Sequence, residues 1–297
     1  MAKKGLKNLT QRNTFMWGWI LVLPTVIGLV VLNLYPMLST IFQSFFKTGD
    51  FGRGNTFVGL SNYSKLFKDR SFILSIGNTL KYTIIEVPIS IIISLVLAQL
   101  LNGKIKGKDI YRTIFFLPMV VAPAAIAMVW KWMYNSEFGL INNIFHISVN
   151  WISSPSIAIF SIAFIGIWSD VGYNMILFIA GLQEVPTDYY EAADIDGASG
   201  FRKFYNITIP MISPMIFFVV VTRVLAALKV FDFIYMIISR ANPALEKTQS
   251  LVYLFYTSAF VENEYGYSSA IVVVLLLIIL LITALQLIGQ KKWVHYN

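Results

Sequence analysis

The sequence predicts an all-α integral membrane protein with six transmembrane helices in a single domain, residues 1–297. Of its residues, 57% are hydrophobic and only 13% are charged, whereas charged residues make up about a quarter of a soluble domain. The apolar residues form runs that reach the roughly 20 residues needed to cross a bilayer. Basic residues gather beside several of these runs. Together these observations exclude a soluble globular protein.

The six expected spans cover about residues 15–35, 78–101, 113–134, 156–182, 210–231 and 268–289. The first run is too long for the core of a signal peptide, and no small-residue cleavage site follows it, so we expect a retained span. The third span contains Pro118 and Pro123, which remove backbone donors, so we expect kinks there. The long connections 36–76, 135–155 and 232–267 would lie outside, the first with a short helix around residues 63–67.

Basic residues beside the apolar runs predict the orientation. They are Lys3, Lys4, Lys7, Arg12, Lys104, Lys106, Lys108, Arg112, Lys291 and Lys292. Basic segments stay on the cytoplasmic side, so a multi-pass protein of the cell membrane is expected, with both termini in the cytoplasm. The formal net charge of +8 is then explained by this orientation signal and by anionic membrane lipid, without a nucleic-acid partner.

The polar segment 186–209 lies between the fourth and fifth spans, on the cytoplasmic side. Asp188 as N-cap with Glu191 at the third helical position forms a capping-box-like start, so we expect a helix from about Tyr189. Gly197 supplies the left-handed backbone that ends such a helix. The segment is therefore expected to turn sharply at Gly197.

A second short helix should follow this turn. Ser199 can act as its N-cap. We expect it to stop near Ile209, because the residue before Pro210 is disfavoured in helical geometry.

The exposed surface of this segment has two interpretations. It combines small residues with apolar ones: Ala192, Ala193, Ala198, Tyr189, Ile195, Phe201 and Phe204. It could fold back onto the membrane surface and tie two spans together, or it could bind the backbone of another protein at close range. Spacing alone does not separate these two roles.

The chain lacks the residue patterns of an enzyme site. There is no phosphate-binding G-x-x-x-x-G-K-[ST] motif, so any ATP must be bound by another chain. Cysteine is absent, which excludes disulfides, thiolate metal sites and cysteine nucleophiles. His146 and His295 are isolated, whereas metal sites need clustered ligands.

Polar groups at membrane depth are costly and usually face a bundle interior or a water-filled path. The candidates here are Asp170, Tyr173, Asn174, Arg223, Lys229 and Asp232. Lys229 and Asp232 are spaced to pair across one helical turn. These residues either line a substrate pathway or form internal ion pairs.

The residues of segment 186–209 resemble a known motif. Its order is E-A-A, two residues, D-G-A, then Phe, Ile and Pro, matched here by residues 191–193, 196–198, Phe204, Ile207 and Pro210. This resembles the cytoplasmic coupling loop of permease subunits in binding-protein-dependent ABC importers. Further stretches resemble sugar permeases of the maltose and glycerol-phosphate importer type: 58–63, Asn78-Thr79, Arg112-Thr113, 116–118, Trp130, 139–142, Phe231-Asp232, Phe260, Gly266-Tyr267 and Ala270.

The resemblance implies the type I ABC importer permease fold with cytoplasmic coupling helices. It implies a transport subunit rather than an enzyme, paired with a second permease, two ATPase subunits that bind ATP and Mg²⁺, and an extracytoplasmic sugar-binding protein. No cofactor of its own is expected. The residues implied to couple to the ATPases are Glu191, Ala192, Ala193, Asp196, Gly197 and Ala198.

The sequence departs from this family at two places. Ala241-Asn242-Pro243 stands where Gly-Gly-Pro is common, and Arg223 stands where a small polar residue is expected. The alternatives are an ion-coupled secondary sugar transporter and a membrane-embedded enzyme.

Arg223 raises the question of substrate, because placing Arg at the centre of an apolar helix costs about 2.5–3.5 kcal/mol. Two explanations offset this cost. Arg223 could line an oligosaccharide route with Tyr173 and Asn174 and bind acidic sugars such as uronates, since a guanidinium holds carboxylates bidentately. Alternatively, Arg223 pairs with Asp170 and the sugar is neutral.

Overall fold

The computed structural model describes residues 2–48, 55–103 and 105–295, with side chains from residue 14 onward. The basic side chains of residues 2–13 and Lys104, which we expect to orient the first two cytoplasmic segments, lie outside the described residues. Most of the described chain is helical.

The first part of the chain contains one long helix, a hairpin and the second long helix. Its elements are α1 Ala2–Leu29, a π-helical segment Val30–Leu34, α2 Tyr35–Gln43, β1 Phe46–Thr48, β2 Asn55–Phe57, α3 Ser61–Leu66 and α4 Arg70–Asn102. The strands pair antiparallel with Phe46 opposite Phe57. The short helix expected around residues 63–67 is present as α3.

The middle and last parts are mainly helical, with turns and loops between the helices. Their elements are α5 Lys108–Val120, α6 Pro123–Met133, α7 Leu140–Phe145, α8 Ala158–Gln183, α9 Thr187–Ile195, α10 Gly200–Lys203, a π-helical segment Phe204–Thr208, α11 Ile209–Met211, α12 Ser213–Ala227, α13 Asp232–Ile237, a 3₁₀ turn Leu245–Lys247, α14 Leu251–Phe260 and α15 Tyr265–Gln290. Segment 232–267, which we expect to lie outside, therefore contains two helices, α13 and α14.

Five helical stretches of the described chain are long and apolar enough to cross a membrane. They are Thr14–Gln43, α4, α8, Ser213–Ile237 and α15. A sixth crossing depends on α5 and α6, which are bent by 98° at their junction. We expected one kinked span at 113–134, and the chain instead breaks into two helices.

Proline chemistry explains this break. Pro123 is the first residue of α6, and Ala122 before it has φ −57° and ψ 134°. A residue before proline is pushed out of the helical region because the proline ring crowds its backbone. The helix therefore stops before Pro123 and restarts in a new direction.

The second span also begins earlier than expected. We expected it from residue 78, but α4 starts at Arg70 because Asp69 caps it, with Oδ1 accepting a hydrogen bond from the Ser71 N–H at 2.8 Å. An N-cap side chain that satisfies a free backbone N–H stabilises a helix start by about 1 kcal/mol.

Helices α4 and α8 lie side by side and form the centre of the bundle, with α5 and α12 packed against them. Gly172 of α8 permits the close approach of α5, because a Cβ atom there would lie 1.9 Å from the Phe115 carbonyl oxygen. Apolar side chains such as Ile162, Ile165 and Phe178 are fully buried along α8. These helices surround the polar residues described below.

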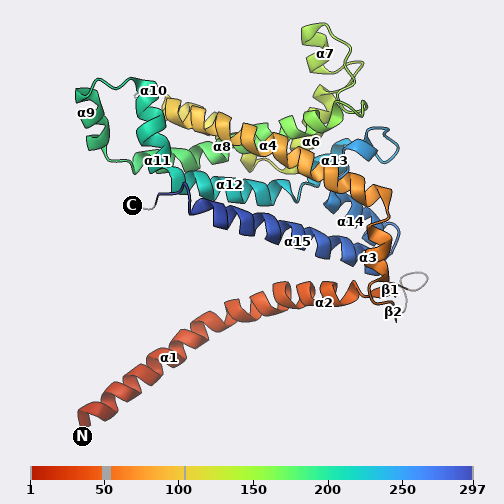
Figure 1. Cartoon of the computed structure of the whole chain (residues 1–297), viewed down its shortest axis with the longest axis horizontal. Coiled ribbons are helices and arrows are strands. Elements are labelled where there is room, and N and C mark those ends of the chain that lie inside the picture. The colour runs from red at the N-terminus through yellow and green to blue at the C-terminus, as the bar shows by residue number, and fades with distance from the viewer. Residues whose placement is uncertain (1, 49–54, 104, 296–297) are drawn as a thin grey trace.

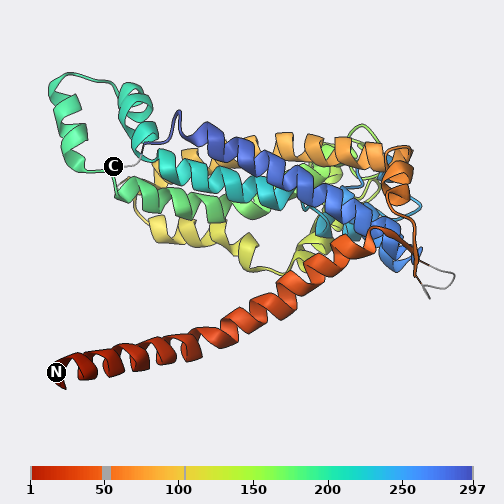
Figure 2. The ribbon, with the colours of Figure 1, turned by 60° about the horizontal axis from the view of Figure 1, so that its bottom comes forward.

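The two ends of the bundle differ. Figures 1 and 2 both place α9 and α10 at the same end as the start of α1 and the close of α15, whereas α3, the hairpin and α14 lie at the opposite end. The stretch Thr14–Gln43 diverges from the bundle (Figure 2), and the most apolar part of it has no buried residues. Its exposed apolar side chains suit a lipid environment or a partner helix better than water.

Candidate functional site

Segment 186–209 begins as a helix, but not at the expected residue. α9 starts at Thr187 with Pro186 at the N-cap, and no side chain caps it. The expected capping box at Asp188 is therefore wrong, and Asp188 lies in the first turn of the helix. The first-turn residues Thr187, Asp188 and Tyr189 are exposed, so water can satisfy their free N–H groups and the helix can begin after Pro186 without a polar cap.

The turn in the middle of this segment is confirmed. Gly197 has φ +68°, a left-handed conformation that costs a residue with a Cβ about 1–2 kcal/mol. Ser199 is the N-cap of α10, and its Oγ accepts a hydrogen bond from the Arg202 N–H at 3.4 Å. Two short helices at an angle result, as expected.

The expected stop at Ile209 is wrong. Ile209 is helical, with φ −59° and ψ −48°, and α11 runs through Pro210. A proline ring normally clashes with the carbonyl four residues earlier, but here the wider π-helical turn Phe204–Thr208 directly precedes it and leaves room. The chain breaks only at Ile212, with φ −90° and ψ 8°.

Three apolar residues of this segment project from it without cover. The exposed fraction is 89% for Ile195, 79% for Phe201 and 52% for Tyr189. The segment is braced from within by the Tyr190 and Thr208 hydroxyls, 2.9 Å apart, and by an ion pair between Lys203 and Asp194 at 2.6 Å. We call residues 186–209 the coupling segment.

The six coupling residues of the sequence motif lie in different surroundings. Glu191, Ala192, Asp196 and Gly197 are exposed, Ala198 is half-buried and Ala193 is buried. The Ala198 N–H donates to the Ala193 carbonyl at 2.9 Å, which closes the end of α9. Part of the motif therefore shapes the turn, and the rest is exposed on the surface of the segment.

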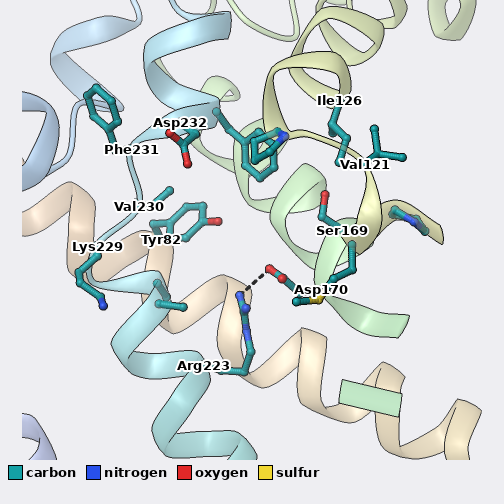
Figure 3. Close-up of a pocket in the computed structure, with 16 residues that line it drawn as sticks. Tyr82, Val121, Ile126, Ser169, Asp170, Arg223, Lys229, Val230, Phe231 and Asp232 are labelled. Atoms are coloured by element: carbon teal, nitrogen blue, oxygen red, sulfur yellow. Dashed lines mark ion pairs between the residues drawn. The ribbon is translucent and has the colours of Figure 1, made fainter. Parts of the chain in front are cut away.

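A second polar site lies inside the bundle, where three helices bring charges together. Arg223 of α12 donates from Nη2 to Glu86 Oε1 of α4 at 2.5 Å, and the same nitrogen lies 2.7 Å from Asp170 Oδ2 of α8. Figure 3 shows the pair between Arg223 and Asp170. The pairing of Arg223 with Asp170, one of the two explanations left open by the sequence, is thus present. We call Glu86, Asp170 and Arg223 the charge cluster.

Glu86 was missed by sequence reasoning. Its side chain is 0% exposed, whereas that of Asp170 is 26% exposed. The signal was available, because Glu86 lies within the expected second span and an acidic residue at membrane depth is as unusual as Arg223. Its partner, 137 positions away, could not be read from the sequence.

The charge cluster lies beside a cavity of about 250 Å³. Asp170 and Arg223 line the cavity, together with Tyr82, Ser169, Lys229, Val230, Phe231 and Asp232 and several apolar residues of α5, α6, α12 and α13. In Figure 3 the Tyr82 hydroxyl, Ser169 and the Asp170 carboxylate point into the same space. The cavity thus combines hydroxyls, aromatic rings and charges within reach of one small ligand.

The other expected pathway residues lie elsewhere. Asn174 is fully buried, and its Nδ2 donates to Ser90 Oγ at 3.0 Å. Neither Asn174 nor Tyr173 lines the cavity. The structure therefore brings Asp170, Arg223 and Lys229 together but not the other two.

Lys229 and Asp232 form no ion pair with each other in the described part of the chain. The expected pairing across one helical turn is wrong, because α12 ends at Ala227 and α13 begins at Asp232, so the two residues do not share a helix. Both are exposed at the rim of the cavity.

The outer turn at Ala241-Asn242-Pro243 is held by one side chain. Asn242 Nδ2 donates to the Ile152 carbonyl at 3.0 Å, and Asn242 Oδ1 accepts from the Ala244 N–H at 2.9 Å. Asn242 thus ties this turn to the segment around Ile152.

Comparison with known proteins is consistent with this architecture. Residues 90–294 match the family of binding-protein-dependent transport system inner membrane components. The sn-glycerol-3-phosphate transport system permease protein UgpA of Agrobacterium fabrum is 33% identical over 94% of this chain and 96% of its own. The trehalose/maltose transport system permease protein MalF of Thermococcus litoralis is 33% identical over 86% of each chain.

A solved structure shares the fold. It is a bacterial alginate ABC transporter in complex with an alginate pentasaccharide-bound periplasmic protein, with a TM-score of 0.83 and 20% identity over 95% of this chain and 96% of that one. At this identity the likeness shows the fold alone. The chain therefore belongs to the family of binding-protein-dependent transport system inner membrane components.

Proposed function

We propose that the chain is the permease subunit of an ATP-driven ABC importer that carries a sugar across the cell membrane. It works with a second permease, with two ATPase subunits that bind ATP and Mg²⁺, and with an extracytoplasmic sugar-binding protein. Both termini and the coupling segment lie in the cytoplasm. The relatives named above transport sn-glycerol-3-phosphate and trehalose or maltose according to their names, which supports a small hydroxyl-bearing cargo.

The coupling segment is the observation that carries this proposal. Ile195, Phe201 and Tyr189 project from two short helices whose angle is set by Gly197. Exposed apolar groups rimmed by polar residues mark sites of protein association, and Glu191 and Asp196 provide that rim. An ion-coupled secondary transporter would not need such a surface at the cytoplasmic end.

The cavity supplies the complementary part of the proposal. It lies between helices near the middle of the chain's membrane-spanning bundle, where polar groups usually mark a substrate path. Closure of the ATPases on the coupling segments would move α8 and α12, which flank the segment and carry Asp170 and Arg223. The same two helices, α8 and α12, thus connect the ATPase contact to the cavity.

Cross-linking tests the coupling role. The chain has no cysteine, so a single cysteine can carry a photoactivated cross-linker without background. Ile195→Cys is the test site, because Ala193 is buried and unsuited to labelling. Ile144→Cys in α7 is the matched control, because Ile144 is an apolar residue 60% exposed on a helix of the outer end.

In the assembled complex, we expect Ile195→Cys to cross-link to an ATPase subunit and Ile144→Cys not to. Labelling of the Ile195→Cys variant in intact cells by a membrane-impermeant thiol reagent would contradict the cytoplasmic location. An absence of cross-links to the ATPase at Ile195, with the complex intact, would contradict the coupling role.

A further inference from the structure

The charged groups around the cavity are unbalanced, and we propose that the cavity selects neutral hydroxyl-bearing sugars over carboxylate-bearing ones, with Glu86 as the residue that determines this selectivity. The inference rests on the proposed import of a sugar. It names the class of sugar and the group responsible.

The first argument is the pairing of Arg223. The one cation in the charge cluster already contacts two carboxylates, Glu86 at 2.5 Å and Asp170 at 2.7 Å. A substrate carboxylate that approached Arg223 would be the third anion around one guanidinium. Like charges at such separations disfavour each other strongly where water is scarce. Arg223 is therefore a poor carboxylate receptor, although a guanidinium alone would be a good one.

The rim of the cavity does not restore the balance. Lys229 contributes one positive charge and Asp232 one negative charge, and both are exposed. The lining itself holds two carboxylates, Asp170 and Asp232, and two cations, and Glu86 behind it brings the count to three carboxylates against two cations. An anionic ligand would enter a site whose formal charge is already negative.

The uncharged groups in the cavity suit a neutral sugar. Ser169 forms part of the cavity wall beside Asp170. The Tyr82 hydroxyl points into the same space (Figure 3), and the carboxylates of Asp170 and Asp232 accept charge-assisted hydrogen bonds from neutral hydroxyl donors.

Glu86 influences the cavity through its contact with Arg223. It is not among the lining residues, and its side chain has no exposed surface. A substitution there changes the charge that Arg223 presents to the cavity and leaves the lining side chains in place. Glu86→Gln is nearly isosteric, so it removes one negative charge with little change of shape.

The experiment uses the complete importer, reconstituted in vesicles together with its binding protein and ATPase subunits. It compares variants of the chain with the wild type. ATP-driven uptake is measured for a neutral oligosaccharide and for its uronate-containing counterpart of equal length. For each preparation, the rate of uronate uptake is divided by the rate of neutral uptake. The readout is this ratio for Glu86→Gln relative to the same ratio for the wild type. Because both preparations contain the same binding protein, its own preference cancels, and a general loss of stability would lower both uptake rates together.

We expect Glu86→Gln to raise this ratio about tenfold, since selectivity is a difference between two affinities and one repulsive charge has been removed. Asp170→Asn should raise it as well, and it takes the place of Glu86→Gln if that variant does not assemble. The double variant Glu86→Gln with Arg223→Gln keeps the net charge of the wild type, so its ratio should remain low. Glu137→Gln, which changes an exposed carboxylate outside the cavity lining, should leave the ratio unchanged.

The inference is overturned if Glu86→Gln assembles and its ratio of uronate to neutral uptake stays within about twofold of the wild-type ratio. If Glu86→Gln does not assemble, the same result for Asp170→Asn overturns it. Neither result affects the proposed function. Failure of the assembled wild-type complex to take up any sugar with ATP would instead overturn the proposed function.

Discussion

The coupling segment and the charge cluster place their side chains in opposite surroundings. The coupling segment exposes apolar side chains, with Ile195 89% exposed, while the charge cluster buries charged ones, with Glu86 0% exposed. Each arrangement is unfavourable when considered alone. Each carboxylate of the charge cluster is paired with Arg223, whereas Ile195 and Phe201 of the coupling segment project without cover within the described chain. The first is therefore part of the folded bundle itself, and the second fits the proposal that it binds an ATPase subunit.

The two regions also differ in what holds them. The charge cluster joins α4, α8 and α12, which pack against one another. The coupling segment is held by backbone geometry at Gly197, one pair of hydroxyls and one exposed ion pair. Mutations in the charge cluster should therefore lower the stability of the whole bundle. Mutations in the coupling segment should mainly weaken its proposed coupling to the ATPase.

The largest effect is expected for Arg223→Gln. Removing the guanidinium leaves Glu86 and Asp170 without a cation, and breaking a buried ion pair by removing one partner costs about 3–5 kcal/mol of the free energy of unfolding. The measurement is thermal unfolding of the purified chain in detergent. Adding Glu86→Gln should recover part of the loss, because it removes one of the unpaired charges. A destabilisation under about 1 kcal/mol would mean that the cluster behaves like an exposed ion pair.

A smaller and more local effect is expected for Gly197→Val. No atom lies within 4 Å of a Cβ placed there, so the cost comes only from the left-handed backbone, about 1–2 kcal/mol, and is greater for a β-branched residue. We expect the chain to insert normally and to lose substrate-stimulated ATP hydrolysis in the complex.

Gly200→Ala is the matched control for this prediction. Gly200 also has open space around it, but its backbone is not left-handed, so ATP hydrolysis should be unchanged. Full stimulation of ATP hydrolysis in the Gly197→Val variant would show that the angle between α9 and α10 is not needed for coupling.

The smallest effect is expected for Asp194→Asn. The ion pair with Lys203 is 2.6 Å long, but the Asp194 side chain is 64% exposed, and exposed pairs contribute about 0–1 kcal/mol to stability. Because salt screens such pairs, any difference from the wild type in thermal unfolding should shrink as the salt concentration rises. A loss as large as that expected for Arg223→Gln would remove the contrast between the two regions.

Much of the coupling segment could be predicted from the sequence, because its signals are local. The turn at Gly197 and the cap at Ser199 each depend on one residue and its neighbours, and both are confirmed. The two errors, at Asp188 and Ile209, arise where a different local structure is present from the one expected. Pro186 starts α9 without a polar cap, and a π-helical turn carries the chain through Pro210.

The candidate cavity was predicted only in part. Arg223 and Asp170 were found because charged residues stand out in apolar runs. Glu86 was missed, and Asn174 was assigned to a pathway although its amide points to Ser90. Which side of a helix faces a neighbour depends on how α4, α8 and α12 pack, and the span containing α8 is apolar on nearly every side, so its pattern does not mark one face.

The sequence by itself determined that the chain is membrane-embedded, that its apolar runs are helical and that a sharp turn at Gly197 interrupts the coupling segment. These follow from composition, length and the backbone preferences of single residues, which do not depend on distant parts of the chain. Only the tertiary structure decided that Arg223 faces two carboxylates rather than one, and that the third span breaks at Ala122 by 98°. The charge that a cavity presents is a sum over residues from separate helices, and that sum exists only after the helices have packed.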